Sequence, residues 1–261
     1  MATFASRRYF LATTLSLVGS ATAFASVHDQ LQQAITKGRQ FLVDLLDTTL
    51  DLLPEYRGSK VYWLFHDNYL ASQVLRKSHP EIANKIDAAL KREKVTSSGK
   101  IEVLFGEVKD HPACFHTELI ELRRTGEKIL KTERKTSRRF DNWFDYADLL
   151  FLHALCNHDC GQVARGCVQD GIKLWDGTGF LDPATKKLAR YATYKLALAR
   201  IASVREGPQE KVTATFLPKL LKLQDKSGGW ITDYDATGKA LGLANVETTC
   251  LVLMALETFA T

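Results

Sequence analysis

The chain lacks three features that would narrow its class quickly. Apart from one stretch near the N-terminus, it has no apolar run approaching the roughly 20 residues that span a bilayer. It contains no Asn-x-Ser/Thr triplet, so N-glycosylation gives no clue. Lys and Arg number 35 against 30 Asp and Glu, a formal charge of +5. An excess this small does not indicate a nucleic-acid partner.

The N-terminus is typical of an export signal. Arg7 and Arg8 precede the apolar stretch Tyr9 to Val18, and Ala23-Phe24-Ala25 offers the small-x-small site that signal peptidases cut. We therefore predict that residues 1–25 are removed and that the mature protein is secreted or periplasmic. The paired arginines also resemble a bacterial twin-arginine signal, which would imply folding before export. A membrane anchor is the alternative, disfavoured because the stretch is short and polar residues follow.

One pattern recurs four times along the chain. A polar, turn-rich loop leads into the first turn of an apolar helix, and that turn carries side chains of catalytic type. The four helix starts are His66-Asp67-Asn68-Tyr69, Tyr146-Ala147-Asp148-Leu149, Ala192-Thr193-Tyr194-Lys195 and Glu247-Thr248-Thr249-Cys250. Two of the loops, Leu46 to Pro54 and Trp175 to Pro183, are equivalent. Such repeats predict stacked helix pairs that share one core, with their loops gathered at one end.

The spacing of apolar residues predicts a mainly α-helical domain. The predicted helices are residues 31–46, 61–75, 80–91, 142–154, 161–174, 188–201, 211–223 and 246–259. The last is apolar nearly all round, as expected of an inner helix with neighbours on both sides. From about residue 100 to 139 the pattern changes: Ile101, Val103 and Phe105 alternate with polar residues, and Thr125-Gly126 separates two strand-like segments. We predict one domain, residues 26–261, with a small antiparallel β insertion there.

The cysteines favour a disulfide. They are Cys114, Cys156, Cys160, Cys167 and Cys250. In an oxidising compartment pairing is expected, and the run from Cys156 to Cys167 joins the end of one helix to the start of the next. Cys250 lies in an apolar run and fits a buried, unpaired side chain. A zinc site built from His153, Cys156, His158 and Cys160 is the alternative. Because export favours disulfides, we predict no metal and no other cofactor.

One segment carries a family resemblance. Gln224-Asp225-Lys226-Ser227-Gly228-Gly229-Trp230 resembles the Gln-x-x-x-Gly-x-Trp motif of terpenoid cyclases. The helix-loop-helix period is similar to the α/α toroid that those enzymes share with protein prenyltransferases and thioester-containing complement domains. In that superfamily the motif is structural, with Gln capping helix ends and Trp stacking beneath a loop. The resemblance therefore implies an α/α toroid, open or incomplete with four units, and no chemistry, since the motifs Asp-x-Asp-Asp, Asp-Asp-x-x-Asp and Cys-Gly-Glu-Gln are missing.

In a helical toroid the loops that feed the inner helices converge on one mouth, so side chains at the helix starts are expected to share a cavity. Two carboxylates across it could act as general acid and base in glycosidic cleavage. Alternatively, His66 or Tyr194 could abstract a proton beside a uronate carboxylate while Lys195 neutralises the charge, as in a lyase. The predicted catalytic residues are His66, Asp67, Asp148, Tyr194 and Glu247. The predicted substrate-binding residues are Trp63, Asn68, Tyr146, Tyr191, Lys195 and Asp233.

These features also have structural interpretations. Asp67, Asn68 and Thr248 are of types that cap helix N-termini, although His66, Tyr146 and Tyr194 are not. Four tryptophans suit stacking against sugar rings or a terpenoid, yet large aromatic side chains dominate cores; they are Trp63, Trp143, Trp175 and Trp230. A basic hairpin suits an anionic polymer, or is a solvated surface that prevents edge aggregation; it carries Arg123, Arg124, Lys128, Lys131, Arg134, Lys135, Arg138 and Arg139.

The sequence as a whole predicts a secreted carbohydrate-active enzyme, a polysaccharide hydrolase or lyase. A non-catalytic secreted protein that binds a glycan or a lipid is the competing class, and a terpenoid-processing enzyme is the third. Acids whose carboxyl groups face one cavity favour the enzyme, whereas acids turned into their own helix termini favour binding. An apolar, aromatic-lined cavity would favour the terpenoid class.

Overall fold

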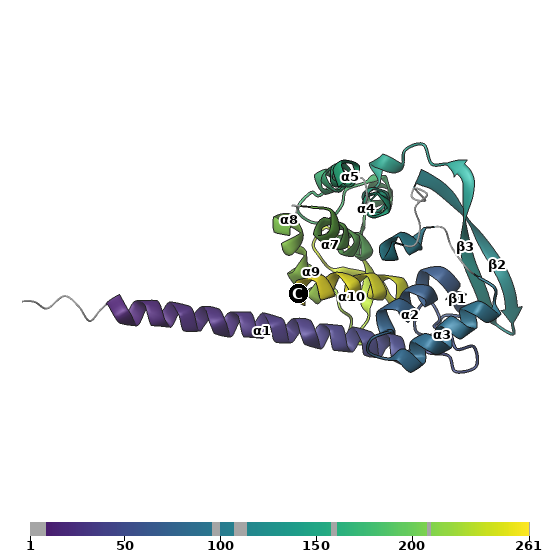
Figure 1. Cartoon of the computed structure of the whole chain (residues 1–261), viewed down its shortest axis with the longest axis horizontal. Helices are drawn as coiled ribbons and strands as arrows, with labels where there is room; N and C mark the ends of the chain where they lie inside the picture. The colour runs from purple at the N-terminus through teal and green to yellow at the C-terminus, as the bar shows by residue number, and fades with distance from the viewer. Residues whose placement is uncertain (1–8, 96–99, 107–113, 158–160, 208–209, 261) are drawn as a thin grey trace, which may run out of the picture.

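The computed structural model describes residues 9–95, 100–106, 114–157, 161–207 and 210–260, and most of this chain is helical (Figure 1). The α-helices are α1 (Tyr9–Asp44), α2 (Leu70–Leu75), α3 (Pro80–Arg92), α4 (Ala147–Cys156), α5 (Gly161–Lys173), α6 (Pro183–Leu188), α7 (Thr193–Glu206), α8 (Glu210–Ala214), α9 (Phe216–Lys222) and α10 (Val246–Ala260). A π-helical turn, η1 (Leu64–Tyr69), and two 3₁₀ turns, η2 (Ile101–Phe105) and η4 (Trp143–Asp145), accompany them. The predicted mainly α class is confirmed.

The strands form two small sheets. The strands are β1 (Val61–Trp63), β2 (Phe115–Thr125), β3 (Lys128–Arg139), β4 (Tyr191–Ala192), β5 (Trp230–Tyr234) and β6 (Ala240–Asn245). The first sheet has the order β1-β3-β2, in which β2 and β3 are antiparallel and β1 runs parallel to β3. The second has the order β4-β5-β6 and is antiparallel. The first sheet contains the predicted hairpin, which turns at Gly126 with φ 60°.

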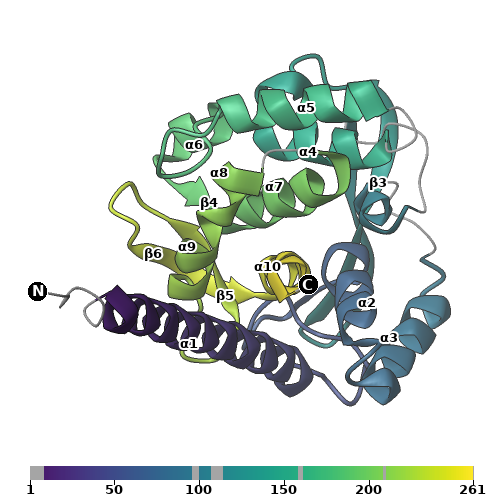
Figure 2. The ribbon, with the colours of Figure 1, turned by 60° about the vertical axis from the view of Figure 1, so that its left-hand side comes forward.

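Helix α10 lies at the centre of the core. It packs against α1, α2 and α7, and Figure 2 shows these helices around it. Cys250, Leu251, Val252 and Leu253 are all buried, although four consecutive residues point in different directions around the helix. The prediction of an inner helix with neighbours on both sides is thereby confirmed.

Four inner helices, α2, α10, α7 and α4, pack side by side in that order. Helix α5 packs outside α4 and α7, and η2 contacts α4 at the far end of the row (Figure 2). Because these helices lie side by side, the side chains at their first turns are brought together, although they come from distant parts of the chain. The candidate site is therefore built by several packed helices together.

The outer helices α1, α5 and α9 end in similar loops. Asp47, Asp176 and Asp225 each stand three positions after the helix end. Each carboxylate accepts a hydrogen bond from the backbone N–H two residues further on, at 2.9, 2.8 and 2.9 Å respectively. Such Asx turns let a short polar side chain replace a backbone turn. The repetition predicted from the equivalent loops therefore extends to their hydrogen bonds.

Two of these loops are also tied to a tyrosine on the strand that follows. Tyr62 of β1 donates its hydroxyl to Asp47 at 2.7 Å, and Tyr191 of β4 donates to Asp176 at 2.6 Å. Each loop is closed by an isolated bridge, Asp47 with Leu52 and Trp175 with Phe180. The same Tyr–Asp hydrogen bond thus fixes the loop that precedes each of two inner helices, α2 and α7.

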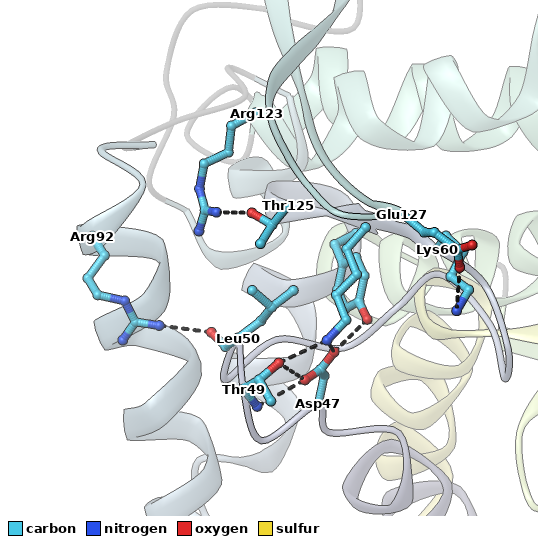
Figure 3. A network of polar contacts seen from close by, with 10 residues as sticks. Asp47, Thr49, Leu50, Lys60, Arg92, Arg123, Thr125 and Glu127 are labelled. Carbon is cyan, nitrogen blue, oxygen red and sulfur yellow. Dashed lines mark hydrogen bonds and ion pairs between the residues drawn. The ribbon is translucent and has the colours of Figure 1, made fainter.

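The hairpin is fastened to the first loop through the network drawn in Figure 3. Lys128 at the start of β3 hydrogen-bonds the carboxylate of Asp47 and lies 2.8 Å from the hydroxyl of Thr49. Burial acts to raise the pKa of Asp47, but the hydrogen bonds from Lys128, Thr49 and Tyr62 outweigh it and lower that pKa. Arg92 of α3 donates to the carbonyl oxygen of Leu50 at 2.8 Å. This anchorage fixes β3 beside the inner helices.

Residues 61–75 are not the single helix that the sequence predicts. They form β1, the π-helical turn η1 and then α2. Val61, Tyr62 and Trp63 pair with Ile129, Leu130 and Lys131 of β3. β-Branched and aromatic residues are favoured in strands, and here a partner far away in the chain decides the outcome.

Three further segments differ from the secondary structure predicted from the sequence. Ile101–Phe105, predicted as a strand, is a 3₁₀ turn whose Ile101, Val103 and Leu104 are buried. The predicted helix 188–201 is interrupted at Ala189, which has φ 54°, before β4 and α7 begin. The predicted loop 224–243 contains β5 and most of β6. In these places tertiary packing overrides the local pattern.

Helix α1 is continuous through the predicted leader, and its N-terminal part projects from the body in Figure 1. Among its described side chains, the buried ones begin at Leu31 and continue through Phe41 and Leu42 to Leu45. The described packing of α1 thus begins beyond the predicted cleavage site, and the cleavage itself stays a prediction. Within the described ranges, no helix combines the length and apolarity needed to cross a membrane.

We expect Gly38→Ala in α1 to destabilise the fold. A Cβ at Gly38 would lie 2.5 Å from Cζ3 of Trp230 and 2.9 Å from Cδ2 of Leu253. Overpacking of this kind usually costs about 1–3 kcal/mol. Gly166→Ala in α5 is the matched control, because its Cβ would meet nothing within 4 Å. It should stabilise by about 0.5–1 kcal/mol through helix propensity. Urea unfolding measures both, and equal effects would contradict the close packing of Trp230 on α1.

Candidate functional site

A cavity of about 300 Å³ lies where the inner helices begin. Five of its lining residues are acidic, so we name it the acidic cavity; they are Glu55, Asp67, Glu133, Asp148 and Glu247. The others are Trp63, His66, Lys100, Ile101, Leu152, Tyr194, Leu198, Asn245 and Leu251. All five residues predicted as catalytic from the sequence line this one cavity.

Those five residues reach the cavity from four different elements. His66 and Asp67 belong to η1, Asp148 to the first turn of α4, Tyr194 to the first turn of α7 and Glu247 to the first turn of α10. The π-helical winding of η1 is unusual, since such turns are rare and frequently occur at functional sites. The side-by-side packing of the inner helices explains how these distant residues meet.

Asp67 has the most unusual environment of the acids. It is 2% exposed, and its Oδ2 atom has no hydrogen-bond partner within the part of the chain that the structure describes. Burial, followed by the negative charges of Glu247 and Glu55, raises the pKa of Asp67 well above its ordinary value. Asp67 therefore holds a proton under conditions in which an exposed aspartate is ionised.

Glu247 and Glu55 are shifted in the same direction. Burial raises the pKa of Glu247; the positive groups His66 and Lys100 oppose that rise, and the charges of Glu133 and Asp148 add to it. Burial also raises the pKa of Glu55, against a hydrogen bond from Trp63 and the charge of Lys131. The acids thus repel one another in a space shielded from water, which favours protonation of some of them.

Asp148 is surrounded differently. Its Oδ2 accepts a hydrogen bond of 2.7 Å from the hydroxyl of Tyr194, and its Oδ1 lies 3.6 Å from Nζ of Lys195. Burial and the charge of Asp148 raise the pKa of Tyr194 well above its usual range, so the phenol keeps its proton and acts as a donor. A hydroxyl and an ammonium group therefore accompany the carboxylate of Asp148.

His66 faces a carboxylate that the sequence did not single out. Its Nε2 lies 3.5 Å from Oε2 of Glu133 on β3. The other ring nitrogen of His66, Nδ1, is buried without a hydrogen-bond partner in the described chain. Glu133 was overlooked because it stands among basic residues of the hairpin, and only the pairing of β1 with β3 brings it to η1.

Glu55 and Lys100 were also missed. Glu55 directly follows the repeated loop Leu46 to Pro54, and its backbone bonds tie that loop to β1 and α10: its N–H donates to Val61 at 2.8 Å, and its carbonyl accepts from Val246 at 3.0 Å. The sequence did contain a signal for Glu55, because this acidic residue directly follows a loop that was already assigned to the site. Lys100 precedes η2 and has no equivalent in the repeats.

A second cavity of about 330 Å³ adjoins the first and shares Lys100, Asp148 and Tyr194 with it. We name it the aromatic cavity, because its remaining lining includes Phe115, His116, Phe140 and Tyr146. The rings of Phe140 and Tyr146 have centroids 5.3 Å apart. The two cavities are therefore neighbours, with Lys100, Asp148 and Tyr194 between them.

The predicted substrate-binding residues divide into two groups. Trp63 lines the acidic cavity, and Tyr146 and Lys195 line the aromatic one. The described lining of the two cavities does not include Asn68, Tyr191 or Asp233.

Those three residues have structural partners. Asn68 is fully buried and uses its side-chain amide to bond both backbone groups of Leu53, at 2.7 and 3.0 Å. Tyr191 bonds Asp176, and Asp233 lies 3.8 Å from Arg190. Capping at the start of α10 is performed by Asn245, whose Oδ1 accepts from the N–H of Thr248 at 2.9 Å. Thr248 is therefore not the cap.

Two of the four tryptophans serve the core. Trp230 is fully buried, and its indole N–H donates to the carbonyl of Leu220 at 2.7 Å. Trp175 packs against Phe216, with ring centroids 4.7 Å apart. Trp63 alone of the four lines either described cavity. The interpretation of large aromatics as core holds for Trp230 and Trp175.

The basic hairpin is largely paired with acids. Arg123 bonds Glu93 at 2.6 Å, Arg124 bonds Glu121 at 3.0 Å, Arg134 pairs with Glu118, and Lys128 with Asp47. Lys131 lies over the ring of Trp63, 5.5 Å from its centroid. Much of the positive charge is thus balanced within the fold, which weakens the case for an anionic polymer on this surface.

Four of the five cysteines lie in the part of the chain that the structure describes. No disulfide joins the cysteines that the structure describes, Cys114, Cys156, Cys167 and Cys250. Cys160 and His158, which belong to the predicted bridge region and to the alternative zinc site, lie outside the described residues. Over the described ranges, no group of three His, Cys, Asp or Glu side chains has an arrangement suited to a metal ion. Cys250 is buried, as expected.

Comparison with protein-family models, with curated proteins and with solved structures finds no match to the chain.

Proposed function

We propose that the chain is a secreted glycoside hydrolase of α/α-toroid type and that the acidic cavity is its active site. The observation that carries this proposal is the contrast between two acids in one cavity. Asp67 is buried, unpaired at Oδ2 and has a raised pKa, whereas Asp148 has a hydroxyl and an ammonium beside it. Two carboxyl groups in environments this different are suited to the separate roles of acid and base.

The roles follow from the two environments. Asp67 donates its proton to the glycosidic oxygen as the bond from that oxygen to the anomeric carbon breaks. Asp148 accepts a proton from the water whose oxygen attacks the anomeric carbon. The sum is the addition of one water across the glycosidic bond, and the proton now on Asp148 leaves through solvent while Asp67 is reprotonated. Tyr194 and Lys195 hold Asp148 in position.

The neighbouring aromatic cavity supports a substrate longer than one sugar. Phe140 and Tyr146 offer ring faces beside Asp148 and Tyr194, and the apolar face of a sugar ring stacks on such surfaces. We propose that one sugar unit lies in the acidic cavity and the next lies in the aromatic cavity. The scissile bond then falls near Asp148, which lines both.

Charge favours a hydrolase over a lyase. A uronate carboxylate would enter a space lined by five acidic side chains, and like charges repel. A lyase also needs a base, but Tyr194 keeps its proton beside Asp148 and His66 faces Glu133. The polar lining likewise disfavours a terpenoid. A purely binding role does not require the environments of Asp67 and Asp148 to differ so strongly, whereas acid and base catalysis does.

The toroid part of the proposal rests on the repeated loops and on the Gln-x-x-x-Gly-x-Trp segment. Nε2 of Gln224 donates to the carbonyl of Ala34 in α1 at 2.9 Å and to that of Gly228 at 2.8 Å. Trp230 packs beneath the same loop, against Gly38. The burial of Trp230 supports the resemblance, whereas Gln224 bonds the interior of α1 and the loop itself and does not cap a helix end. We propose an open arc of helix pairs and not a closed ring.

The decisive experiment is a polysaccharide screen with purified protein, following reducing ends and, separately, the absorbance of unsaturated uronates. Asp148→Asn should lower the rate of reducing-end release by about 100-fold or more, because the base is lost. Asp170→Asn, on the exposed surface of α5, is the matched control and should keep the full rate. Silence across a broad panel would overturn the proposal, and signal only in the uronate channel would replace the hydrolase by a lyase.

A further inference from the structure

The hydrolytic step uses two acids, and the acidic cavity has five. Glu55, Glu133 and Glu247 take no part in the proton transfers proposed for Asp67 and Asp148. They come from three separate elements, the loop before β1, the strand β3 and the first turn of α10. Buried like charges destabilise a fold, so three additional carboxyl groups at one place require an explanation.

The oxygen atoms of this cavity include several without donors. Within the described chain, Oδ2 of Asp67, Oε2 of Glu133 and Oδ1 of Asp148 are buried and accept no hydrogen bond. Nε2 of His66 lies 3.5 Å from that oxygen of Glu133, and Nζ of Lys195 lies 3.6 Å from that of Asp148, so both oxygens have a cationic group nearby but no hydrogen bond from it. Asp67 is itself 98% buried, because its exposed fraction is 2%, and it lines the cavity. Buried acceptors in native structures nearly always have a partner, so these atoms are positioned for donors that a ligand would bring.

Around the acidic cavity, the positive groups that the structure describes are fewer than the acids. The ammonium of Lys195 is 3% exposed and bonds Asp182, so its charge is already shared with a second carboxylate. Lys131 lies over Trp63 at the edge of the cavity, and Lys100 lines it. His66 faces Glu133 at 3.5 Å. The cavity is lined by five acids, so carboxylate oxygens outnumber these positive groups.

We propose that the sugar unit bound in the acidic cavity carries a protonated amino group, and that the substrates are glycans rich in free amino sugars. An ammonium group supplies three donors and a positive charge, which suit Oε2 of Glu133 and Oδ1 of Asp148, while Asp67 keeps its proton for the leaving group. A neutral sugar supplies hydroxyl donors without the charge, and an N-acetylated sugar loses the charge at the same position. This inference rests on the proposed function, since it names the substrate of that site.

Binding is tested separately from hydrolysis by calorimetry with the full chain. The probes are glucosamine oligomers, N-acetylglucosamine oligomers and neutral glucose oligomers of equal length, at one pH and ionic strength. Glucosamine oligomers should bind at least tenfold more tightly than the other two. Glu133→Gln should weaken the binding of glucosamine oligomers by about tenfold, roughly the effect of removing one close charge, and leave that of neutral oligomers unchanged. Asp170→Asn should alter neither.

The outcomes separate the two proposals. If neutral or acetylated oligomers are hydrolysed and glucosamine oligomers have no advantage, the substrate class is wrong and the hydrolase stands. If glucosamine oligomers bind tightly and Glu133→Gln weakens them, but no oligomer is cleaved, the ligand class stands and the hydrolase is wrong. Equal binding by spermidine, which carries ammonium groups without sugar rings, would overturn the assignment to a glycan, and so would equal binding by Ca²⁺.

Discussion

Asp67→Asn is expected to lower the rate of glycan hydrolysis by about 10²- to 10⁴-fold and to make the folded protein more stable at neutral pH. The loss of rate follows because an amide cannot donate the proton that departs with the leaving group. The gain in stability follows because the wild-type carboxyl is buried with Oδ2 unpaired, close to other acids. Opposite effects on activity and stability are typical of residues placed for function.

The stability gain should depend on pH in a defined direction. The pKa of Asp67 is raised in the folded state, whereas in the unfolded chain it is near the ordinary value of about 3.9. Above that value the folded state holds one more proton than the unfolded state, so wild-type stability falls as the pH rises towards the folded-state pKa. Asp67→Asn lacks this term. The difference in unfolding free energy should be small below about pH 4 and grow above it.

Urea unfolding between pH 3 and pH 8 measures this difference, with the rate assay run on the same preparations. Asp170→Asn is again the control, because it replaces an exposed acid on α5 by the same amide. If Asp67→Asn were less stable than wild type throughout that pH range, Asp67 would be a structural residue and the assignment of general acid would fail.

Lys195→Met is expected to produce the largest loss of stability, about 3–5 kcal/mol. Lys195 is 3% exposed, its ammonium bonds the fully buried carboxylate of Asp182, and it lies 3.6 Å from Asp148. Removing the cation leaves Asp182 charged, buried and without its counter-ion. Asp182 is also held in place, because its carboxylate accepts a hydrogen bond of 3.1 Å from the N–H of Thr185 as the cap of α6.

A double-mutant cycle separates the charge from the packing. Asp182→Asn keeps an oxygen for the cap of α6 and removes the charge, so the double variant Lys195→Met/Asp182→Asn should recover much of the stability lost by Lys195→Met alone. Lys187→Met, at an exposed position of α6, should change stability by less than about 0.5 kcal/mol. Strictly additive effects of the two replacements would show that the pair does not interact.

The sequence predicted well those parts of the molecule that depend on nearby residues. The hairpin was found because Thr125-Gly126 marks its turn, and α3 because Pro80 begins an amphipathic run. The five predicted catalytic residues, all of which line the acidic cavity, were found because four similar loop-helix junctions pointed to one place. That inference required the repetition, since His66 and Glu247 have no local connection.

What the sequence missed depends on pairing between distant segments. Val61–Trp63 was assigned to a helix because its partner, β3, lies far along the chain. For the same reason Glu133, an acid within the basic hairpin, was not assigned to the site, although that pairing carries it to within 3.5 Å of His66. Asn68 was assigned to the site because it follows Asp67, yet its amide serves the backbone of Leu53. One-dimensional patterns do not distinguish such neighbours.

The two ends of the described chain interlock, and this has a consequence for biosynthesis. Helix α1 lies against α10, Arg39 forms a 2.6 Å ion pair with Glu257, and Gln224 reaches back to the carbonyl of Ala34. Helix α1 is therefore synthesised long before α10, which packs against it. A chain cut before α10 would lack Leu253, which lies beside Gly38, so docking of α1 into the core is expected to wait until α10 has been synthesised.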